Sequence, residues 1–442
     1  MLTENLNGII HSFVAPDSSG SAYDQALLGP AENNQHNEEN EHSQHNENNE
    51  QNGYFENYDV SDGLEYIDNF EDERLNLKNE ILKGIYGYGF EKPSPIQRIG
   101  IKPIIDGKDI VLQSHSGTGK TATFIIGLLQ NIDFNLQETQ CIVISNTREL
   151  ADQTYKVFGR LAEYANVKCN LCIGGDLQNR YISNTLKDQV IIGTPGRISD
   201  LLSKQIINTQ YVKLLIIDEA DDVLSSSFRK QVKRIFQNIS KETQVILISA
   251  TIPPEMSELL NDILKPDYLS VLVKDDELTL DGILQYYVYI DEHYKLDALI
   301  DIYKYVSIGQ AIVYCNKKNK AEDLKNELLH NSFAVSTLHG DMMQKEREEI
   351  MKEFRSGKTR ILITTDILSR GIDIQQVSLV INFDMPKYPQ TYIHRIGRSG
   401  RFGRKGNAIN FVTKREKNIL TFIKKIYNTE IIELPYDVSK LF

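Results

Sequence analysis

Short aliphatic runs alternate with helical patterns along this chain from about residue 72 onward. Runs of this kind separated by helices predict β-α-β units around a parallel sheet. Five runs form a first series: DIVLQS (109–114), QCIVISN (140–146), QVIIGT (189–194), KLLIIDEA (213–220) and TQVILISAT (243–251). Five more form a second series: QAIVYCN (310–316), AVSTLHG (334–340), TRILITTD (359–366), VSLVINFD (377–384) and NAINFVT (407–413). The pattern therefore predicts two successive α/β domains, each with a parallel sheet.

The two series are separated by VKDDELTLDGI, residues 273–283, whose polar composition predicts a linker. We place the first domain at residues 67–272 and the second at residues 284–442, since a chain of 442 residues is long enough for two cores. At the start of the first domain and ahead of its strand series, LNLKNEILKGIYGYGF predicts a helix that ends at a glycine.

Residues 1–66 differ in composition from the rest, because residues 31–52 are almost entirely Asn, Glu, Gln and His. Such a segment cannot bury enough apolar area to offset the conformational entropy lost on ordering. It therefore predicts a disordered acidic tail. His36, His42 and His45 could bind a metal, but a solvated polar tract is the favoured interpretation.

The formal net charge of −12 belongs to the N-terminal region, since residues 1–70 hold nine Glu, five Asp and neither Lys nor Arg. The remaining residues carry 49 basic and 47 acidic side chains, a balance that permits a local basic groove for nucleic acid. No apolar stretch approaches the roughly 18 residues of a membrane span, and the start MLTENLNGII does not resemble a secretory signal. We therefore expect no membrane association.

Four cysteines, without a disulfide pattern, predict a reducing compartment inside the cell. Cys169 and Cys172 have the spacing of a metal or redox pair, but the chain has no second pair to complete a zinc site. Their context, VKCNLCIGG, is typical of a strand, which is the favoured interpretation.

SHSGTGKT, residues 114–121, follows a predicted strand and precedes a predicted helix, which is the context of a phosphate-binding P-loop. Glycines there allow backbone N–H groups to approach phosphate oxygens, Lys120 would reach the β- and γ-phosphates, and Thr121 would face Mg²⁺. Ser114 stands where the pattern has its first glycine. The predicted nucleotide contacts of the loop are Ser116, Gly117, Thr118, Gly119, Lys120 and Thr121.

Four acids, Asp218, Glu219, Asp221 and Asp222, directly follow the aliphatic run LLII. A P-loop site requires a carboxylate near its metal at the end of a neighbouring strand. We predict that Asp218 binds Mg²⁺ with Thr121 and that Glu219 polarises the attacking water. The alternative is a solvated acidic loop, which rarely follows a buried strand so abruptly.

The second series contributes HRIGRSGR, with Arg395, Arg398 and Arg401 at three-residue spacing. An isolated basic stretch is usually a solvated face. Beside a phosphate site, these arginines predict fingers that stabilise the charge developing on a transferred phosphate.

The motifs together resemble those of the DEAD-box RNA helicases over nearly all of residues 70–442. They are GFEKPSPIQ (89–97), SGTGKT, TREL, TPGR (194–197), DEAD, SAT (249–251), TTDILSRGID (364–373) and HRIGRSGR (394–401). The resemblance implies two RecA-like domains that bind ATP and Mg²⁺ between them and single-stranded RNA across both. Within the family the resemblance is closest to the helicases of translation initiation.

The resemblance also implies roles for individual residues. Gln97 would read the adenine edge, Phe70 would stack on the base, and Asp373 would contact the ribose. Ser249 and Thr251 would couple hydrolysis to domain closure, and His394 would meet them. The implied RNA contacts are Thr147, Arg148, Gly175, Thr194, Gly196, Arg197, Arg347, Thr364 and Thr365. The implied catalytic residues are Lys120, Asp218, Glu219, His394, Arg398 and Arg401.

Contacts to phosphates by N–H groups, hydroxyls and arginines predict RNA binding that is independent of sequence and sensitive to salt. The favoured function is a monomeric, cytoplasmic RNA helicase that unwinds short duplexes with a scaffold protein of translation initiation. The alternatives are an ATP-gated RNA clamp in an exon-junction-like or ribosome-biogenesis assembly, which would allow a nuclear location, and a DNA-directed ATPase. One departure from the family pattern is Asn146, where a proline is expected before TREL.

Overall fold

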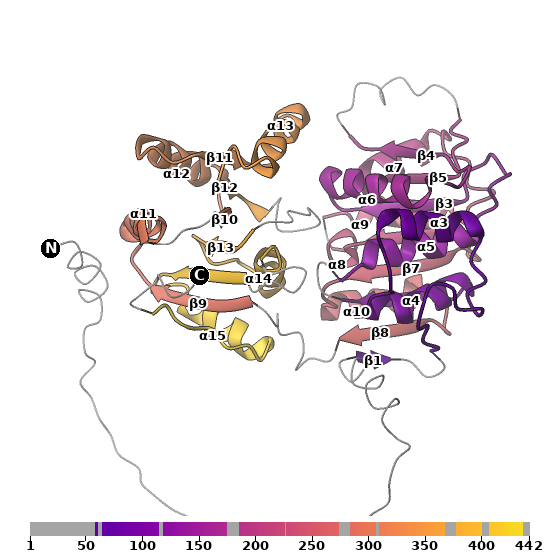
Figure 1. Ribbon diagram of the computed structural model, residues 1–442, viewed down its shortest axis with the longest axis horizontal. Coiled ribbons are helices and arrows are strands. Elements are labelled where there is room, and N and C mark those ends of the chain that lie inside the picture. Colours follow the sequence, from indigo (N-terminus) through magenta and orange to yellow (C-terminus); the bar gives the residue numbers. More distant parts are fainter. Residues whose placement is uncertain are drawn as a thin grey trace, which may run out of the picture. The chain divides into compact units, whose positions relative to one another are not determined.

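The structure is a computed structural model that describes residues 58–60, 64–114, 118–174, 185–225, 227–273, 283–305, 309–366, 377–399 and 406–435. By its internal contacts, Asn57–Phe442 is one unit of the chain. All of the described residues belong to this unit, which contains two sheets with helices alongside (Figure 1).

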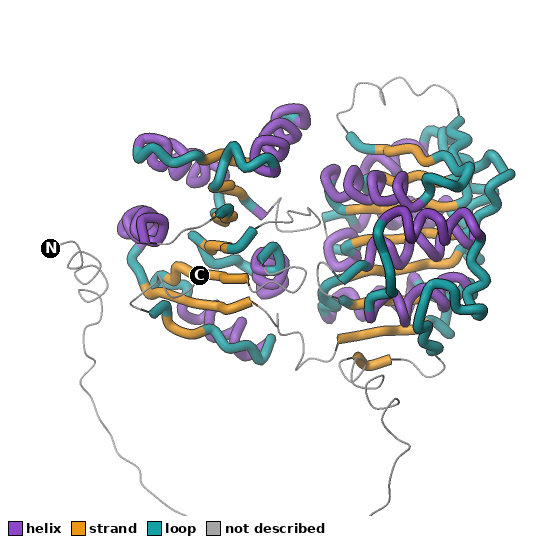
Figure 2. Tube along the Cα trace, in the orientation of Figure 1, coloured by secondary structure: helices purple, strands orange, loops and turns teal. Residues whose placement is uncertain are grey.

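The first sheet has eight strands in the order β1-β8-β2-β7-β6-β3-β5-β4. Seven of these strands run parallel, and β1 pairs with β8 in the antiparallel direction. The strands are β1 (Tyr58–Val60), β2 (Ile110–Gln113), β3 (Cys141–Ser145), β4 (Cys169–Cys172), β5 (Val190–Gly193), β6 (Leu214–Asp218), β7 (Gln244–Ser249) and β8 (Leu269–Val273). The neighbouring strands are adjacent orange segments in Figure 2.

Helices cover both faces of this sheet (Figure 1). They are α3 (Asn79–Tyr88), α4 (Pro95–Ile105), α5 (Lys120–Asn131), α6 (Arg148–Leu161), α7 (Pro195–Ser203), α8 (Ala220–Val223), α9 (Arg229–Asn238) and α10 (Pro254–Ile263). Every residue of β2, β3, β5, β6 and β7 is buried. Burial on both faces explains why these strands read as continuous aliphatic runs rather than as alternating patterns.

The second sheet has seven parallel strands in the order β11-β12-β10-β13-β14-β9-β15. They are β9 (Ile283–Tyr289), β10 (Ala311–Tyr314), β11 (Val335–Leu338), β12 (Ile361–Thr364), β13 (Leu379–Asn382), β14 (Gly406–Val412) and β15 (Ile432–Glu433). Its helices are the short η3 (Glu292–Tyr294), α11 (Lys295–Tyr305), α12 (Lys318–His330), α13 (Gln344–Arg355), α14 (Pro389–Ile396) and α15 (Lys417–Ile426).

All ten predicted strands are present, and two parallel sheets confirm the predicted fold class. The predicted strand at Cys169–Cys172 is also confirmed as β4, and all four cysteines are free. Helix α3 ends at Gly89, whose φ of 98° is the left-handed conformation that favours glycine at a helix end.

The predicted boundaries of the tail and the linker agree less well with the structure. The strand Tyr58–Val60 falls inside the predicted tail at residues 1–66, yet it pairs with β8 and so extends the first sheet. Residues 1–57 and 61–63 lie outside the described part of the chain, as do residues 274–282 of the predicted linker. The boundaries of tail and linker therefore stay predictions. Within the described ranges, no helix is long and apolar enough to cross a membrane.

The parallel direction of these strands positions the functional residues. Ser145 at the end of β3 pairs in register with Asp218 at the end of β6, and Gln113 at the end of β2 pairs with Ser249 at the end of β7. Four separate motifs therefore meet at the carboxyl edge of one sheet, which is where open α/β sheets bind ligands.

Candidate nucleotide and nucleic-acid sites

The predicted P-loop connects β2 to α5. Gly119 caps α5 with a φ of 100°, and a Cβ there would lie 2.7 Å from Nε2 of Gln97. The backbone conformation therefore favours glycine at this position, and a side chain here would also displace the amide of Gln97. Lys120 is the first residue of the helix, and its ammonium donates a hydrogen bond to the carbonyl of Ser114. A lysine at a helix N-terminus behind a glycine turn is an arrangement that binds phosphate.

Gln97 connects the first turn of α4 to this loop. Its Oε1 accepts a hydrogen bond from the Ser94 N–H at 2.8 Å, and its Nε2 lies 3.4 Å from the carbonyl oxygen of Gly119. The side chain is 2% exposed. The structure thus places Gln97 beside the P-loop, where the resemblance requires it.

Phe70 is 1% exposed, and its ring centroid lies 6.5 Å from that of Phe90. The ring offers no free face to a base in this conformation. The predicted stacking of adenine on Phe70 stays a prediction.

The first two acids occupy the turn between β6 and α8. Asp218 is the last residue of β6 and accepts a hydrogen bond from the N–H of Glu219 at 3.0 Å. Glu219 has a φ of 53°, an uncommon left-handed conformation for a side chain of this size. Both residues are buried, at 4% and 9% exposure. The strand end therefore holds two carboxylates in a fixed and partly strained turn.

Burial dominates the electrostatics of this turn. It raises the pKa of Asp218 to about 6, although the charge of Lys120 lowers it. Burial likewise raises the pKa of Glu219, while His394 and Arg398 lower it. The pKa of Lys120 is lowered by burial, against the effect of the three acids Asp218, Glu219 and Asp221. The site thus holds excess negative charge that an added cation would stabilise.

The donor set fits a magnesium ion. The carboxylate of Asp218 and the hydroxyl of Thr121 are hard oxygen donors, the type that Mg²⁺ prefers. Beside them, Oε2 of Glu219 is buried without a hydrogen-bond partner among the described residues. These features suit an ion that takes few protein ligands and completes its shell with substrate phosphates and water.

Asp221 joins three of the predicted motifs. Its Oδ2 accepts a hydrogen bond from the Thr251 hydroxyl at 2.6 Å and lies 2.9 Å from Nε2 of His394. Its N–H donates to the Ser249 hydroxyl at 3.3 Å, and that hydroxyl donates to the Thr251 carbonyl at 2.7 Å. The side chains of Asp221 and His394 are 3% and 1% exposed. Ser249, Thr251 and His394 are therefore brought together as the resemblance implies.

The role of Asp221 was not predicted from the sequence. The run of four acids marked the segment, but a P-loop site explains only the first two, because it needs one metal ligand and one group for water. Nothing in the local pattern showed that the third acid would face residues 30 and 173 positions away.

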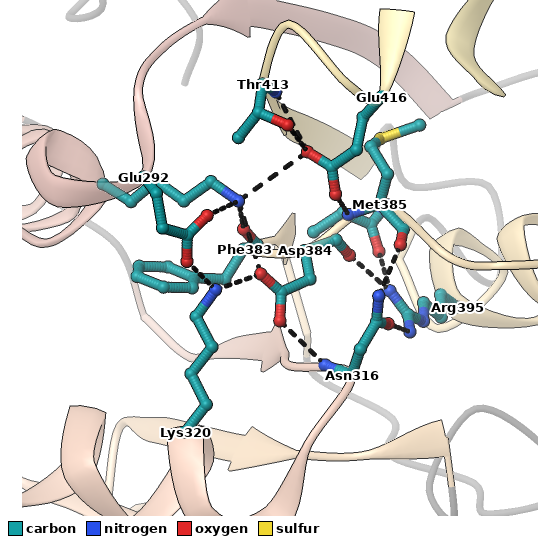
Figure 3. Close-up of polar contacts among 11 residues, drawn as sticks. Glu292, Asn316, Lys320, Phe383, Asp384, Met385, Arg395, Thr413 and Glu416 are labelled. Atoms are coloured by element: carbon teal, nitrogen blue, oxygen red, sulfur yellow. Dashed lines mark hydrogen bonds and ion pairs between the residues drawn. The ribbon is translucent and has the colours of Figure 1, made fainter. Parts of the chain in front are cut away.

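Arg398 lies close enough to the P-loop that its charge lowers the pKa of Lys120, which supports its predicted role as a finger. Arg395 is different, and its interpretation as a finger does not fit the structure. It is fully buried, and its Nε donates to Oδ1 of Asp366 at 2.7 Å. Its guanidinium also donates to Oδ1 of Asn316 at 2.8 Å and to the carbonyl of Asp384 at 2.7 Å (Figure 3).

The Asp384 side chain extends this network. It accepts hydrogen bonds from the Asn316 N–H at 2.9 Å and from the ammonium groups of Lys320 and Lys295 (Figure 3). Lys295 is itself fully buried and donates to the carbonyl of Phe383 at 2.7 Å. Three-residue spacing along α14 and its C-terminal turn directs Arg395 and Arg398 to different surroundings, so Arg395 anchors the second domain.

A second site lies beside the first. A cavity of about 530 Å³ gathers six of the nine predicted RNA contacts. These six are Thr147, Arg148, Thr194, Gly196, Arg197 and Arg347. The pocket is the strongest support in the structure for the predicted RNA contacts, because these residues come from segments far apart in the sequence.

Two helix N-termini open onto this pocket. Thr147 caps α6 and its hydroxyl accepts a hydrogen bond from the N–H of Leu150 at 3.2 Å. Thr194 precedes α7, and a Cβ at Gly196 in its first turn would meet nothing within 4 Å. N-terminal N–H groups and the positive end of each helix dipole favour an anion in such a place.

Three arginines and two acids line the same pocket. Arg197 pairs with Asp200 at 2.9 Å, and Arg347 pairs with Glu149 at 2.7 Å. The second pair is nearly buried, with side chains 7% and 11% exposed. Because Glu149 occupies the guanidinium of Arg347, a phosphate that binds Arg347 would compete with that carboxylate.

Two of the predicted RNA contacts that the structure describes, Thr364 and Thr365, do not line the pocket. The hydroxyl of Thr364 is fully buried and donates toward the carbonyls of Leu338 and Thr365, so it does not face the pocket, whereas Thr365 is half-buried. Thr118 precedes α5 and Thr121 is its second residue, and their predicted contacts with nucleotide and Mg²⁺ stay predictions. Ser116, Gly117, Gly175, Asp373 and Arg401 lie outside the described residues.

Comparisons with known proteins agree with this geometry. Residues 94–259 match the DEAD/DEAH box helicase family, and residues 294–403 match the helicase conserved C-terminal domain. Eukaryotic initiation factor 4A of Drosophila melanogaster is 49% identical over 380 residues, which cover 85% of this chain and 93% of that protein. ATP-dependent RNA helicase eIF4A of Pyricularia oryzae is 48% identical over 388 residues, which cover 87% of this chain and 96% of that protein.

A solved structure is similar over most of the chain as well. Dbp5 of S. cerevisiae bound to RNA and ADP BeF3 has a TM-score of 0.78 and 36% identity, covering 83% of this chain and 95% of that chain. The first family match contains the P-loop, the acids and most of the RNA pocket, and the second contains His394 and Arg398.

Proposed function

The chain belongs to the DEAD-box ATP-dependent RNA helicases, which are RNA-stimulated ATPases, and on this basis we propose that it unwinds short RNA duplexes during translation initiation by ATP-driven closure of its two domains. The observation that carries the proposal is the hydrogen-bonded group of Asp221, Thr251 and His394. It connects the acidic turn of the first domain to the helix of the second domain that leads to Arg398.

Each side chain of the nucleotide site has a role in the proposed reaction. Lys120 and the N-terminus of α5 hold the phosphates, and Gln97 selects adenine. Glu219 orients the attacking water and accepts its proton, and Arg398 stabilises the negative charge that develops on the transferred phosphoryl group. Mg²⁺, when bound by Asp218 and Thr121, neutralises phosphate charge. Arg401, outside the described residues, would act with Arg398.

Hydrolysis is linked to closure through Asp221. The contact to His394 exists only when the two domains meet, whereas the contact to Thr251 lies within the first domain. Closure therefore completes the set of partners around Asp221 and brings Arg398 to the phosphates in the same movement. A bent single strand fits the closed form and a straight duplex does not, so closure separates strands.

The RNA pocket supports binding without base recognition. Its polar groups are arginine side chains, hydroxyls and helix N-termini, which bind phosphate oxygens and read no base. Such binding weakens steeply with salt, because each phosphate contact releases counterions from the RNA.

The cellular role is proposed from the relatives. Two relatives at 48–49% identity are named as initiation factor 4A, which supports a cytoplasmic function in translation. We infer that the protein acts as a monomer with a scaffold protein that brings the two domains together.

Strand displacement from a short RNA duplex tests the proposal, measured with ATP for the wild type, Glu219→Gln and Glu242→Gln. Glu242 is an exposed residue between α9 and β7, so Glu242→Gln is a matched control for the same change of side chain. The wild type and the control should unwind, and Glu219→Gln should not. If RNA stays bound after hydrolysis while ATPase turnover is suppressed and no strands separate, the protein is an ATP-gated clamp and not a helicase.

A cell-free translation extract tests the cellular role separately. Excess Glu219→Gln protein should inhibit translation of a messenger with a structured leader, because it binds RNA and ATP without turning over. An extract unaffected by the variant would refute the translation assignment and leave the helicase activity standing.

A further inference from the structure

Asn146 forms a hydrogen bond that connects the two sites of the first domain. Its Nδ2 donates to Oδ2 of Asp222 at 2.7 Å, across 76 positions of sequence. The residue is 8% exposed and follows the end of β3. Its Oδ1 is buried and accepts no hydrogen bond from the described residues, so the bond to Asp222 is what orients this amide among them.

The two ends of this bond belong to different sites. Asn146 lines the RNA pocket and is covalently joined to Thr147, which caps α6. Asp222 lies in α8, next to Asp221 and three residues after Glu219. Because α8 is a single turn of four residues, a displacement of Asp222 moves Asp221 and Glu219 with it.

The bond depends on the side chain that this chain has at position 146. The family pattern expects proline there, and proline has neither a side-chain donor nor a backbone N–H. The amide orientation is also determined by the partner, since only Nδ2 can donate to a carboxylate. The connection is therefore a feature of Asn146 itself rather than of the surrounding fold.

We propose that Asn146 is a positioning residue that transmits RNA binding to the acidic turn of the ATP site through Asp222. The proposal rests on the assignment of the pocket to RNA phosphates in the proposed function. A phosphate held at the N-terminus of α6 shifts the loop that carries Asn146, and the hydrogen bond passes this shift to α8. Coupling between two ligands is reciprocal. Nucleotide binding must therefore change RNA affinity by the same factor by which RNA binding changes nucleotide affinity.

The test compares RNA stimulation of ATPase in three kinds of variant. They remove the hydrogen bond, replace it by repulsion between two carboxylates, or exchange its donor and acceptor. Asn146→Ala removes the donor, and Asn146→Asp sets a second carboxylate against Asp222. Asn146→Asp combined with Asp222→Asn exchanges donor and acceptor and restores the bond. Asp222→Asn alone completes the double-mutant cycle, which isolates the pair from the other contacts of each residue.

The chain contains a matched control. Asn170 in β4 donates its amide to Oδ2 of Asp188 at 3.1 Å, in the same domain but on the edge strand of the sheet. Asn170→Asp makes the same chemical change there, and it should leave RNA stimulation at the wild-type level. Thermal unfolding of every variant identifies any loss of folding.

The measured quantities are the ratio of kcat with saturating RNA to kcat without RNA, and the Kd for single-stranded RNA with and without a non-hydrolysable ATP analogue. Asn146→Ala and Asn146→Asp should lower the kcat ratio about tenfold, which corresponds to about 1.4 kcal/mol. They should also reduce the nucleotide-dependent change in the Kd for RNA. The exchanged pair should recover a kcat ratio within about threefold of the wild-type ratio. A difference of that size is smaller than the free energy of one hydrogen bond to a charged group.

Two results would overturn the inference, and they differ from a failure of the proposed function. Folded Asn146 variants with the wild-type ratio would show that the bond transmits nothing. An exchanged pair no more coupled than Asn146→Asp would show that residue 146 acts by some means other than this bond. A wild-type protein without RNA stimulation would refute the proposed function, and the inference would fall with it.

Discussion

Replacing Arg395 by methionine should destabilise the second domain rather than remove a catalytic group. The guanidinium is fully buried, donates to Asn316, Asn382, Asp366 and the Asp384 carbonyl, and lies 5.0 Å from the ring centroid of Tyr314. A methionine of similar length leaves every one of these acceptors without its donor.

The magnitude follows from the acceptors. The two asparagine oxygens and the carbonyl of Asp384 are neutral groups, and an orphaned buried acceptor costs about 1–3 kcal/mol. Asp366 is 49% exposed and can be solvated by water, so its contribution is small. The loss should be at least about 3 kcal/mol, which is the sum for three orphaned acceptors at the lower end of that range. For a domain of this size, that is a fall in Tm of roughly 10 °C.

Differential scanning calorimetry and steady-state ATPase together test the reasoning. Arg395→Met should lower the Tm of one transition and keep its KM for ATP at temperatures where the protein remains folded. Arg360→Met, at an exposed position before β12, serves as the control and should change neither quantity. An Arg395→Met protein of wild-type stability whose kcat has fallen 10³-fold would refute the structural interpretation and restore Arg395 as a finger.

Three further predictions concern the phosphate sites and the buried carboxylate. Arg148→Met should weaken RNA binding for all sequences alike, and it should reduce the slope of log K against log salt by about 0.7, measured by anisotropy titration. Gly119→Ala should abolish binding of an ATP analogue, because of the φ of 100° and the 2.7 Å approach to Gln97; calorimetric binding at wild-type affinity would contradict this. Burial raises the pKa of Asp384, but its contacts to Lys320, the Asn316 N–H and Lys295 outweigh burial and hold that pKa below its usual 3.8. The carboxylate therefore stabilises the fold above about pH 4 and loses this contribution as acid brings the pH below its lowered pKa. Denaturant unfolding should show Asp384→Asn to be less stable at neutral pH and less sensitive to acid, and parallel profiles for the two proteins would contradict the assignment.

The residues of the nucleotide site could be found from the sequence because each lies in a short segment whose chemistry is local. A glycine turn before Lys120 and acids directly after LLII are adjacent in the chain, and the strand–helix alternation already indicated that such segments meet at one sheet edge. The same alternation indicated the fold class, since short continuous aliphatic runs between helical patterns are typical of strands buried on both faces.

The tertiary structure decided which of several similar residues takes which role. Arg395 and Arg398 are equivalent in the sequence pattern, yet α14 and the turn that follows it bury Arg395 among acceptors of its own domain and direct Arg398 toward Lys120. Asp221 and Asp222 are neighbours of the same type, yet one faces His394 and the other faces Asn146. Spacing along a chain fixes which side chains share a strand or a turn of helix, whereas partners 30 to 173 residues away depend on the packing of whole elements. Packing is determined by the whole chain together, so no local segment of this sequence contains it.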